Sequence, residues 1–445
     1  MDSLYRNAAE TPVEAPFVFD GHILAEALKN LYKRKYDPKK EIDPLLFSEV
    51  SRILGKAVDE GFENPDIEDE FIRQLKSSTE VFSAFKTHRM GRDMAAKLLD
   101  DKGQLKSYRQ FKQDVLPIAS HHIDNWLKTE YNTAVRRAHL AADFERYKRN
   151  ADILPNLRWE PSTSVNKREL HIPFYDRVWA IDDPFWADNF PGSLWNCKCG
   201  ISPTDDPLTD NSDIITLDVK PHKGLDGNPA VTGQIFSDDH PYHPADCRHC
   251  PFGKVKPLQI INAKKDCYAC GKVQAVIQDA KLMGEYERLK LSEEYKDVIF
   301  DEDSGGLSAV HIEHNFDPTI GKFGIPRGDY EKLSTEALRK AGHKVILASE
   351  HAETGIKTPD GFLDDIKMDI KGVEGTGKWT IKNKFLSAGK QGVETIILYF
   401  HDKGMYSLEK VKEGWFYYLY DMKDHSQTIK NILCVVDGKV LKIEV

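Results

Sequence analysis

The chain has 445 residues, a net charge of −9, 40% hydrophobic residues and 10% aromatic residues. This length predicts two or three domains, and the composition is sufficient for real hydrophobic cores. The overall acidity argues against a nucleic-acid coat along the whole chain, but it leaves room for a local basic site. No apolar run approaches the ~20 residues needed to span a bilayer, and the N-terminus has no signal-peptide pattern. We therefore expect no membrane partner and no export through the general secretory route.

The first part of the chain is predicted to be mainly helical. Apolar residues recur at three- and four-residue spacing in four stretches, which are Gly21 to Tyr32, Leu45 to Glu60, Asp66 to Leu99 and Tyr108 to Arg149. Only short interruptions separate these stretches. The pattern predicts an elongated or bundled helical region.

An aromatic and cysteine-containing segment follows and ends near residue 205. It contains His171, an Asp-Asp-Pro-Phe-Trp run that ends at Trp186, and a Trp-Asn-Cys-Lys-Cys run that ends at Cys199. Upstream, Thr129 to Ala134 reads Thr-Glu-Tyr-Asn-Thr-Ala. Together these motifs resemble the phage Mu protein F-like family of minor head (head morphogenesis) proteins. The resemblance implies a mainly α Mu F-like domain over residues 1–205.

Two cysteines in this segment lie close to other possible metal ligands in the sequence. Cys197 and Cys199, with His171 and Asp183, can bind a metal or form a redox pair, although two cysteines this close form only a strained disulfide. The interpretation we favour is that the cluster locks an irregular loop. Trp186 and Trp195 are predicted to lie in the core.

A second set of cysteines predicts a structural zinc site. Cys247 and Cys250 form one CxxC pair, and Cys267 and Cys270 form another. The two pairs are separated by 16 residues, which is a spacing typical of a tetrahedral Zn²⁺ site. His243 and His249 are alternative ligands. The competing interpretation is two disulfides, which would need an oxidising compartment. Cys434 is predicted to be a buried, inert thiol.

The zinc module is predicted to lie in an irregular linker over residues 206–300. Residues 204–239 are rich in Asp, Pro and Gly, which favours an irregular connector. Leu282 to Tyr295 is predicted to be a charged helix. A solvated turn at residues 301–306 then introduces the last domain.

Residues 301–445 are predicted to form an α/β (or α+β) domain. Two amphipathic stretches predict helices at Asp329 to Ala341 and at Thr380 to Gln391. Apolar and aromatic runs predict strands at residues 394–400, 415–420, 432–436 and 440–445.

Acidic residues and a lysine in this domain have the spacing found in nuclease active sites. Asp369 and Lys371 lie two residues apart on a predicted strand, so their side chains share one face, and Asp360 ends the preceding turn. Two converging carboxylates, Asp360 and Asp369, can bind Mg²⁺ or another divalent cation. Lys371 can then orient the attacking water or stabilise charge on a phosphate.

The order of these elements resembles the PD-(D/E)xK nuclease superfamily. That order is a helix with a glutamate, a strand, a Pro-Asp, a second strand, and Asp-x-Lys. Glu331 fits the first acidic position, with Glu336 and Glu350 as substitutes. The resemblance implies phosphodiester hydrolysis in which Glu331 supports the metal or its water.

The following helix is basic and extends this resemblance. From Lys371 to Lys390 there are five lysines and one acidic residue, Glu374, as a nucleic-acid backbone requires. Thr358 to Asp360, Asp369 to Lys371 and Ala388 to Gln391 resemble motifs of the tRNase toxins of contact-dependent growth inhibition systems. This resemblance implies that Gln391 assists the substrate or the water, and that tRNA is the leading substrate, with other RNA or DNA as alternatives.

Two histidines give a competing mechanism for the same domain. His311 and His314 lie in a strand-like segment, and histidine can act as a general acid or base. Nucleases of the barnase–EndoU–colicin type use such chemistry without a metal. On a regular strand, however, these two side chains would face opposite ways.

Taken together, the motifs predict a phage head-associated protein with a C-terminal nuclease, similar to polymorphic toxins of the Mu F type. This predicts portal or capsid proteins, nucleic acid and an immunity protein as partners, and location in the virion and the bacterial host cytoplasm. The alternative is a purely structural head protein whose C-terminal domain binds without catalysis, because fold does not fix function.

Overall fold

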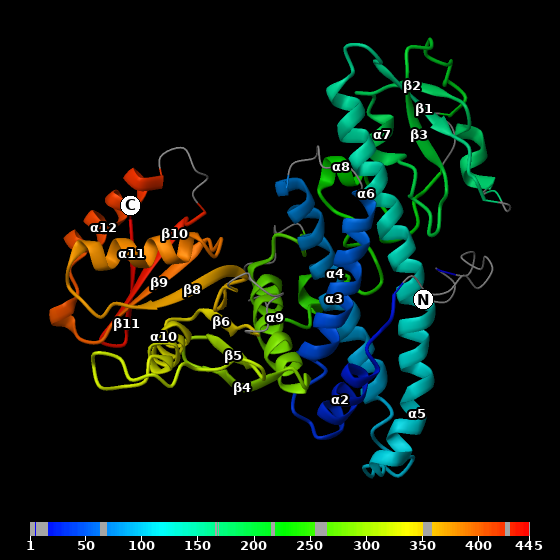
Figure 1. The fold of residues 1–445 in the computed structure, drawn as a ribbon. Coiled ribbons are helices and arrows are strands. Elements are labelled where there is room, and N and C mark those ends of the chain that lie inside the picture. Colours follow the sequence, from blue (N-terminus) through cyan, green and yellow to red (C-terminus); the bar gives the residue numbers. More distant parts are fainter. Residues whose placement is uncertain are drawn as a thin grey trace. The chain divides into compact units, whose positions relative to one another are not determined.

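The computed structural model describes residues 5, 17–62, 69–164, 167, 169–214, 219–253, 265–349, 358–422 and 428–444. The chain forms two compact units, Met1–Gly284 and Glu285–Val445 (Figure 1). The predicted linker is divided between them, because its residues up to Gly284 belong to the first unit and the rest to the second. No helix in the described ranges is long and apolar enough to cross a membrane.

Helices dominate the first part of the first unit, as the apolar periodicity predicts. They are α2 (Gly21–Tyr32), α3 (Pro44–Gly61), α4 (Asp69–Ala95), α5 (Tyr108–Ser120), the π-helix η2 (His121–Leu127) and α6 (Lys128–Arg149). Aspartate or serine side chains accept hydrogen bonds from backbone N–H groups at the starts of α2, α3 and α5. The four predicted helical stretches contain helices, with α5, η2 and α6 forming the last of them. In the third, α4 ends at Ala95 rather than Leu99, and residues 66–68 lie outside the described ranges.

Helix α3 packs against both α4 and α6. Its buried residues recur along one broad face, including Val50, Leu54, Ala57 and Gly61. At Gly61 a Cβ atom would lie 2.5 Å from the Ala138 Cβ on α6, so only glycine permits this close approach of the two helices.

The aromatic segment of the first unit contains a small antiparallel sheet. Its strands are β1 (Asn156–Glu160), β2 (Val178–Ala180) and β3 (Gly200–Thr204), in the order β2-β1-β3, accompanied by the 3₁₀-helix η3 (Glu169–Phe174) and the short helix α7 (Phe185–Asp188). Trp186 packs in this subdomain's core, and Trp195 packs in the core of the helices. Both tryptophans are 1% exposed, which confirms their predicted burial.

The irregular segment that follows also packs into the first unit. It contains α8 (Pro229–Thr232), the 3₁₀-helix η5 (Cys247–His249) and the first part of α9 (Gly271–Leu291). Its side chains, such as Phe236, Tyr242 and Ile277, belong to the same core as α3, α4 and α6. The prediction of a helix from Leu282 to Tyr295 was wrong at both ends. Val273, Ile277, Ala280 and Gly284 are buried at helical spacing from the start of α9, whereas Tyr295 begins a strand.

The second unit is built on an eight-stranded mixed sheet with the order β11-β10-β9-β8-β7-β6-β5-β4. The strands are β4 (Tyr295–Phe300), β5 (Leu307–His311), β6 (Lys344–Leu347), β7 (Gly361–Leu363), β8 (Ile366–Gly372), β9 (Thr395–Phe400), β10 (Asn431–Val436) and β11 (Lys439–Ile443). The pairs β5–β6, β8–β9 and β9–β10 are parallel, and the remaining neighbours are antiparallel. A helical N-terminal region and an α/β C-terminal region are therefore both present, as predicted.

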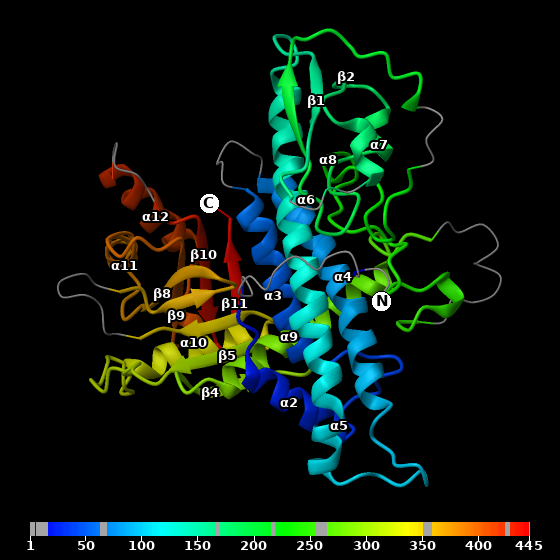
Figure 2. The same ribbon diagram turned by 90° about the vertical axis from the view of Figure 1, so that its right-hand side faces the viewer.

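Helices cover both faces of this sheet (Figures 1 and 2). On one face, α10 (Gly328–Lys340) packs on residues that include Met368, Ile370 and Ile397. On the other face, α11 (Lys378–Gly389) and α12 (Leu408–Met422) pack on residues that include Ile396 and Leu398. A 3₁₀-helix, η7 (Lys403–Met405), precedes α12. All six residues of β9 are buried because both of its faces are covered.

The prediction of a strand at residues 415–420 was wrong, because this stretch lies within α12. Its aromatic residues favour a strand, but the buried positions are Val411, Gly414, Trp415 and Tyr418, which have helical spacing. Phe416, between these positions, is 63% exposed. The helical spacing of the buried residues therefore determines the structure of this stretch, despite the strand propensity of its aromatic side chains.

Candidate active site

Strand β8 carries the Asp-x-Lys pair. Met368 and Ile370 pack on the α10 side, so the alternation of the strand directs Asp369 and Lys371 to the α11 side. The Asp369 side chain is completely buried, and Lys371 Nζ lies 2.5 Å from its Oδ1 atom. The two-residue spacing therefore produces the shared face that the sequence predicts.

Asp360 is fixed beside this strand by a backbone hydrogen bond. It lies in the turn before β7, where its own carbonyl oxygen accepts a hydrogen bond from the Ala348 N–H at 2.9 Å. Its Oδ2 atom accepts a hydrogen bond from the Ile370 N–H at 2.7 Å. Because Ile370 follows Asp369 directly, this bond brings the two acidic residues together across the β7–β8 hairpin.

The electrostatics of Asp369 reflect this convergence. Burial raises the pKa of Asp369 to about 8, and the negative charge of Asp360 raises it as well, whereas the ammonium group of Lys371 acts in the opposite direction. Burial and the charge of Asp360 together outweigh the effect of the Lys371 ammonium group on the pKa of Asp369. Such a site favours a proton or a further cation.

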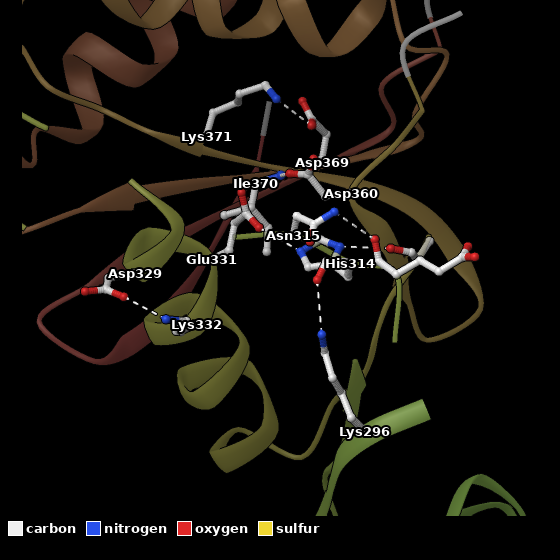
Figure 3. Close-up of polar contacts among 12 residues, drawn as sticks. Lys296, His314, Asn315, Asp329, Glu331, Lys332, Asp360, Asp369, Ile370 and Lys371 are labelled. Carbon is white, nitrogen blue, oxygen red and sulfur yellow. Dashed lines mark hydrogen bonds and ion pairs between the residues drawn. The ribbon is translucent and has the colours of Figure 1, made fainter. Parts of the chain in front are cut away.

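Glu331 comes from α10, on the other face of the sheet, and interacts electrostatically with Asp360 and Lys371 (Figure 3). Burial raises the pKa of Glu331, and the charge of Asp360 raises it further, while the hydrogen bond with His314 and the charge of Lys371 lower it. Its side chain is 21% exposed. Glu331, Asp360, Asp369 and Lys371 therefore form one electrostatically coupled cluster.

His314 is a member of this cluster that the sequence motif does not include. Its Nδ1 atom lies 2.8 Å from the Ala348 carbonyl oxygen, which can only accept, so Nδ1 carries a proton. Its Nε2 atom lies 3.0 Å from Glu331 Oε2. A second proton must therefore lie between the imidazole and the carboxyl group for these two atoms to form a hydrogen bond. The sequence signal for His314 was only its residue type and its nearness to His311.

Helix α11 adds two polar side chains to the cluster. The Gln391 amide, just after this helix, lies against Asp369, and with its nitrogen turned towards the carboxylate it donates to the two oxygens at 2.7 and 2.8 Å. Burial lowers the pKa of Lys384, which also interacts with Glu374, Lys371 and Asp369. Lys384 is thus a second lysine close to the acidic group.

The competing residues of the sequence analysis lie in different surroundings. Glu336 pairs with Lys340 on the surface of α10 at 2.6 Å, with 49% of its side chain exposed, and Glu350 lies outside the described residues. His311 stacks edge-on against Tyr295 and lies 3.9 Å from Glu313, whereas the His314 ring contacts Glu331. The structure therefore brings together Glu331, Asp360, Asp369, Lys371 and Gln391, and gives His311 and His314 different partners.

Three of the four CxxC cysteines contribute to the helical core, and Cys247 begins η5. Cys267 is buried within that core, and Cys250 and Cys270 pack against it. All seven cysteines of the chain are free thiols. Among the described residues, only His171, Cys197 and Cys199 have metal-ligand atoms that all lie within 4.8 Å of one another. The zinc site at Cys247, Cys250, Cys267 and Cys270 stays a prediction.

The fold and the cluster define a class of protein with a helical N-terminal unit and an α/β C-terminal unit that carries buried acidic and basic groups. In sequence, the chain is similar to protein F of Escherichia phage Mu, which is named for capsid assembly, with 29% identity over 75 residues. It is also similar to the FluMu F protein of a Mu-like prophage of Haemophilus influenzae, with 27% identity over 75 residues.

These matches are distant and partial. Each covers 17% of this chain, together with 17% of the phage Mu protein and 18% of the FluMu protein, so the chain spans less than a fifth of the length of these relatives. The chain matches no known family profile, and no solved structure matches it. The relatives support the Mu F-like resemblance, while the nuclease resemblance stays a prediction.

Proposed function

We propose that this chain is a phage head-associated protein whose C-terminal unit is a metal-dependent nuclease. The head-associated role is supported by the distant similarity to protein F of phage Mu and to the FluMu F protein. The phage portal and capsid proteins are the partners of this role, and the virion and the host cytoplasm are its locations. An immunity protein would be a further partner if the nuclease acts as a toxin.

The observation that carries the nuclease proposal is the buried acidic pair beside a lysine. Asp360 is tied to the Asp369 strand by the hydrogen bond from the Ile370 N–H, and Lys371 Nζ lies 2.5 Å from Asp369. The elements α10, β6, β7, β8, α11 and β9 follow one another in the order that the PD-(D/E)xK resemblance requires. No motif alone is specific. The order of the elements and the convergence of the two carboxylates together support the nuclease proposal.

A divalent cation such as Mg²⁺ fits the residues of this site. Asp360 and Asp369 offer hard carboxylate oxygens, and burial together with the charge of Asp360 raises the pKa of Asp369, so a nearby cation would stabilise its charged form. The oxygens of Glu331, Asp360 and Asp369 do not all lie within 4.8 Å of one another in the described chain. Mg²⁺ is commonly held by one or two carboxylates while water and phosphate complete its shell, so Asp360 and Asp369 would be sufficient.

The chain's own residues then have distinct tasks. When bound, the cation supplies Lewis-acid stabilisation of the phosphate and lowers the pKa of water. Asp360 and Asp369 hold it, Glu331 supports it or orients a water, and Lys371 orients the nucleophile or stabilises phosphate charge. Gln391 positions substrate or water. Lysines of α11, including Lys384, contribute to a basic surface for the nucleic-acid backbone, and tRNA is the leading substrate.

The test is cleavage by the full-length protein of total tRNA and of plasmid DNA, with Mg²⁺ or with EDTA. Asp369→Asn should lower the rate by about a hundredfold or more, because it removes a charge that acts on the reacting centre. Asp365→Asn is the matched control, since Asp365 lies in the same hairpin with 82% of its side chain exposed. Lys371→Met should also lose activity, while Lys367→Met, on the exposed end of the same strand, should keep it.

Three results would separate the proposed functions. Metal-dependent cleavage that Asp369→Asn loses supports the nuclease and identifies its polymer. Cleavage that resists EDTA and survives Asp369→Asn moves the assignment to the metal-free histidine mechanism. No cleavage of either polymer favours a structural head protein with a non-catalytic binding domain.

A further inference from the structure

A buried group of two thiols and one imidazole lies in the small sheet subdomain of the first unit. His171 comes from η3, and Cys197 and Cys199 directly precede β3. Their exposed fractions are 0%, 3% and 0%. His171 Nδ1 lies 3.4 Å from Cys197 Sγ and 3.6 Å from Cys199 Sγ. The three ligand atoms all lie within 4.8 Å of one another.

These distances match the edges of a tetrahedral zinc site. With Zn–S bonds of ~2.3 Å and Zn–N bonds of ~2.0–2.1 Å, tetrahedral angles place a sulfur and a nitrogen about 3.5 Å apart. Both observed Nδ1–Sγ distances lie within about 0.1 Å of that value. The imidazole nitrogen therefore already lies at the distance from each sulfur that a shared ion requires.

The surrounding hydrogen bonds orient the ligand atoms towards one point. His171 Nε2 lies 3.1 Å from Ser193 Oγ, so a proton on Nε2 leaves the Nδ1 lone pair directed at the sulfurs. The Cys199 N–H donates to Cys197 Sγ at 3.4 Å, which stabilises a thiolate. A histidine that binds a metal through one nitrogen and donates from the other is the common arrangement in protein metal sites.

Asp183, the fourth candidate of the sequence analysis, does not belong to the group. Its Oδ1 atom accepts a hydrogen bond from the Phe185 N–H at 2.8 Å, at the start of α7. Aromatic rings pack around the imidazole instead, with Trp159 at 5.2 Å and Phe174 at 6.1 Å between ring centroids. Simple packing would explain burial of the three side chains, but it does not require their lone pairs to converge.

We propose that His171, Cys197 and Cys199 bind a thiolate-preferring divalent cation such as Zn²⁺. The two thiols release their protons to solvent on binding, and no oxidation occurs. The ion joins η3 to the segment before β3. The ligands His171 and Cys197 on these two segments are 26 residues apart along the chain. It therefore holds together a subdomain that has only three short strands.

The test measures the zinc content of the full-length protein and the absorption spectrum after Co²⁺ substitution. Cys197→Ser and His171→Phe should each lose about one equivalent of metal relative to the wild type. His171→Cys should retain it, because three thiolates also bind zinc, whereas a packing role for the imidazole would not be rescued by cysteine. Cys434→Ser, a buried thiol of β10, is the control and should change nothing. The comparison with wild type separates this ion from any zinc at the CxxC pairs.

A second measurement needs no variant that might fail to fold. A zinc chelator added to the wild-type protein should speed hydrogen exchange in peptides that cover residues 169–174 and 197–204, while peptides of β9, in the second unit, are unaffected. Equal metal content in wild type, Cys197→Ser and His171→Phe would overturn the proposal. Unchanged exchange of both peptides after complete removal of metal would also overturn it.

Discussion

Each unit of the chain buries charged side chains, but the two units compensate these charges differently. In the first unit, Glu130 is completely buried and lies 2.8 Å from the Lys86 ammonium group. Its other oxygen accepts hydrogen bonds from Tyr5 at 2.9 Å and from Tyr242 at 2.8 Å. In the second unit, buried Asp369 has Lys371 as an ion-pair partner but also faces the negative charge of Asp360.

Arg137 shows the same full compensation in the first unit. Its guanidinium group is completely buried and donates to backbone carbonyl oxygens, among them those of Ile235 at 2.6 Å, Gly227 at 2.9 Å and Leu225 at 3.1 Å. These bonds attach the irregular segment after β3 to α6. The buried charges of the first unit are each matched by an ion pair or by hydrogen bonds, whereas two carboxylates that share one close lysine are typical of a functional site.

The largest expected effect on stability comes from breaking the compensated pair. Lys86→Met should destabilise the first unit by about 3–5 kcal/mol, because Glu130 is left buried and unpaired. The double variant Lys86→Met/Glu130→Gln should recover part of this loss. Hydrogen exchange of peptides from α3, α4 and α6 measures the change within the first unit.

The matched control for this pair is an exposed one. Lys281 lies 2.7 Å from Glu80, with 48% of the lysine side chain exposed, so Lys281→Met should change stability by less than about 1 kcal/mol. If Lys86→Met lowers the stability of the first unit by no more than Lys281→Met does, the buried pair is not structural.

A smaller effect is expected at His314, which acts on the acidic cluster through Glu331. His314→Gln should lower nuclease activity by about 10–100-fold, as loss of a group that orients a metal-site residue does. It should also shift the pH profile, because the proton shared with Glu331 is lost. His311→Gln is the control and should retain wild-type activity, since His311 contacts Tyr295 and Glu313 instead.

The opposite outcome would change the mechanism. If His311→Gln and His314→Gln both abolished cleavage, and the wild-type activity resisted EDTA, a metal-free histidine mechanism would replace the metal-dependent one. Kinetics of each variant with and without EDTA distinguish these cases.

The sequence predicts those features that depend on the spacing of residues within a single helix or strand. Gly21–Tyr32 has the bounds expected from its apolar spacing, and the two-residue offset of Asp369 and Lys371 determines their shared face. Residues 415–420 were mistaken for a strand because aromatic propensity and helical period disagree there, and the core contacts of α12 follow the period. Local pattern is therefore reliable where propensity and period agree.

Features that depend on distant contacts could not be predicted from the sequence. His314 meets Glu331 and the Ala348 carbonyl only because β5, β6 and α10 come together in the fold. The carbonyl groups that surround Arg137 belong to an irregular segment up to 98 residues away, where composition indicates only a connector. Likewise, the exclusion of Asp183 from the cysteine group follows from its hydrogen bond at the start of α7.

We propose that Asp369 is kept buried for function at a cost in stability. The direct measurement is the unfolding free energy of the sheet around β8 in wild type and Asp369→Asn, in EDTA, from pH 4 to pH 9. The unfolded state loses the Asp369 proton near pH 4, while the folded state keeps it until its pKa of about 8, so wild-type stability should fall with rising pH across this window.

We expect Asp369→Asn to match the wild type near pH 4 and to be more stable by on the order of a few kcal/mol above pH 8. Addition of Mg²⁺ at that pH should stabilise the wild type and leave Asp369→Asn unchanged. If Asp369→Asn is instead less stable than the wild type above pH 8, and Mg²⁺ affects neither protein, then Asp369 is a structural residue and the claim is contradicted.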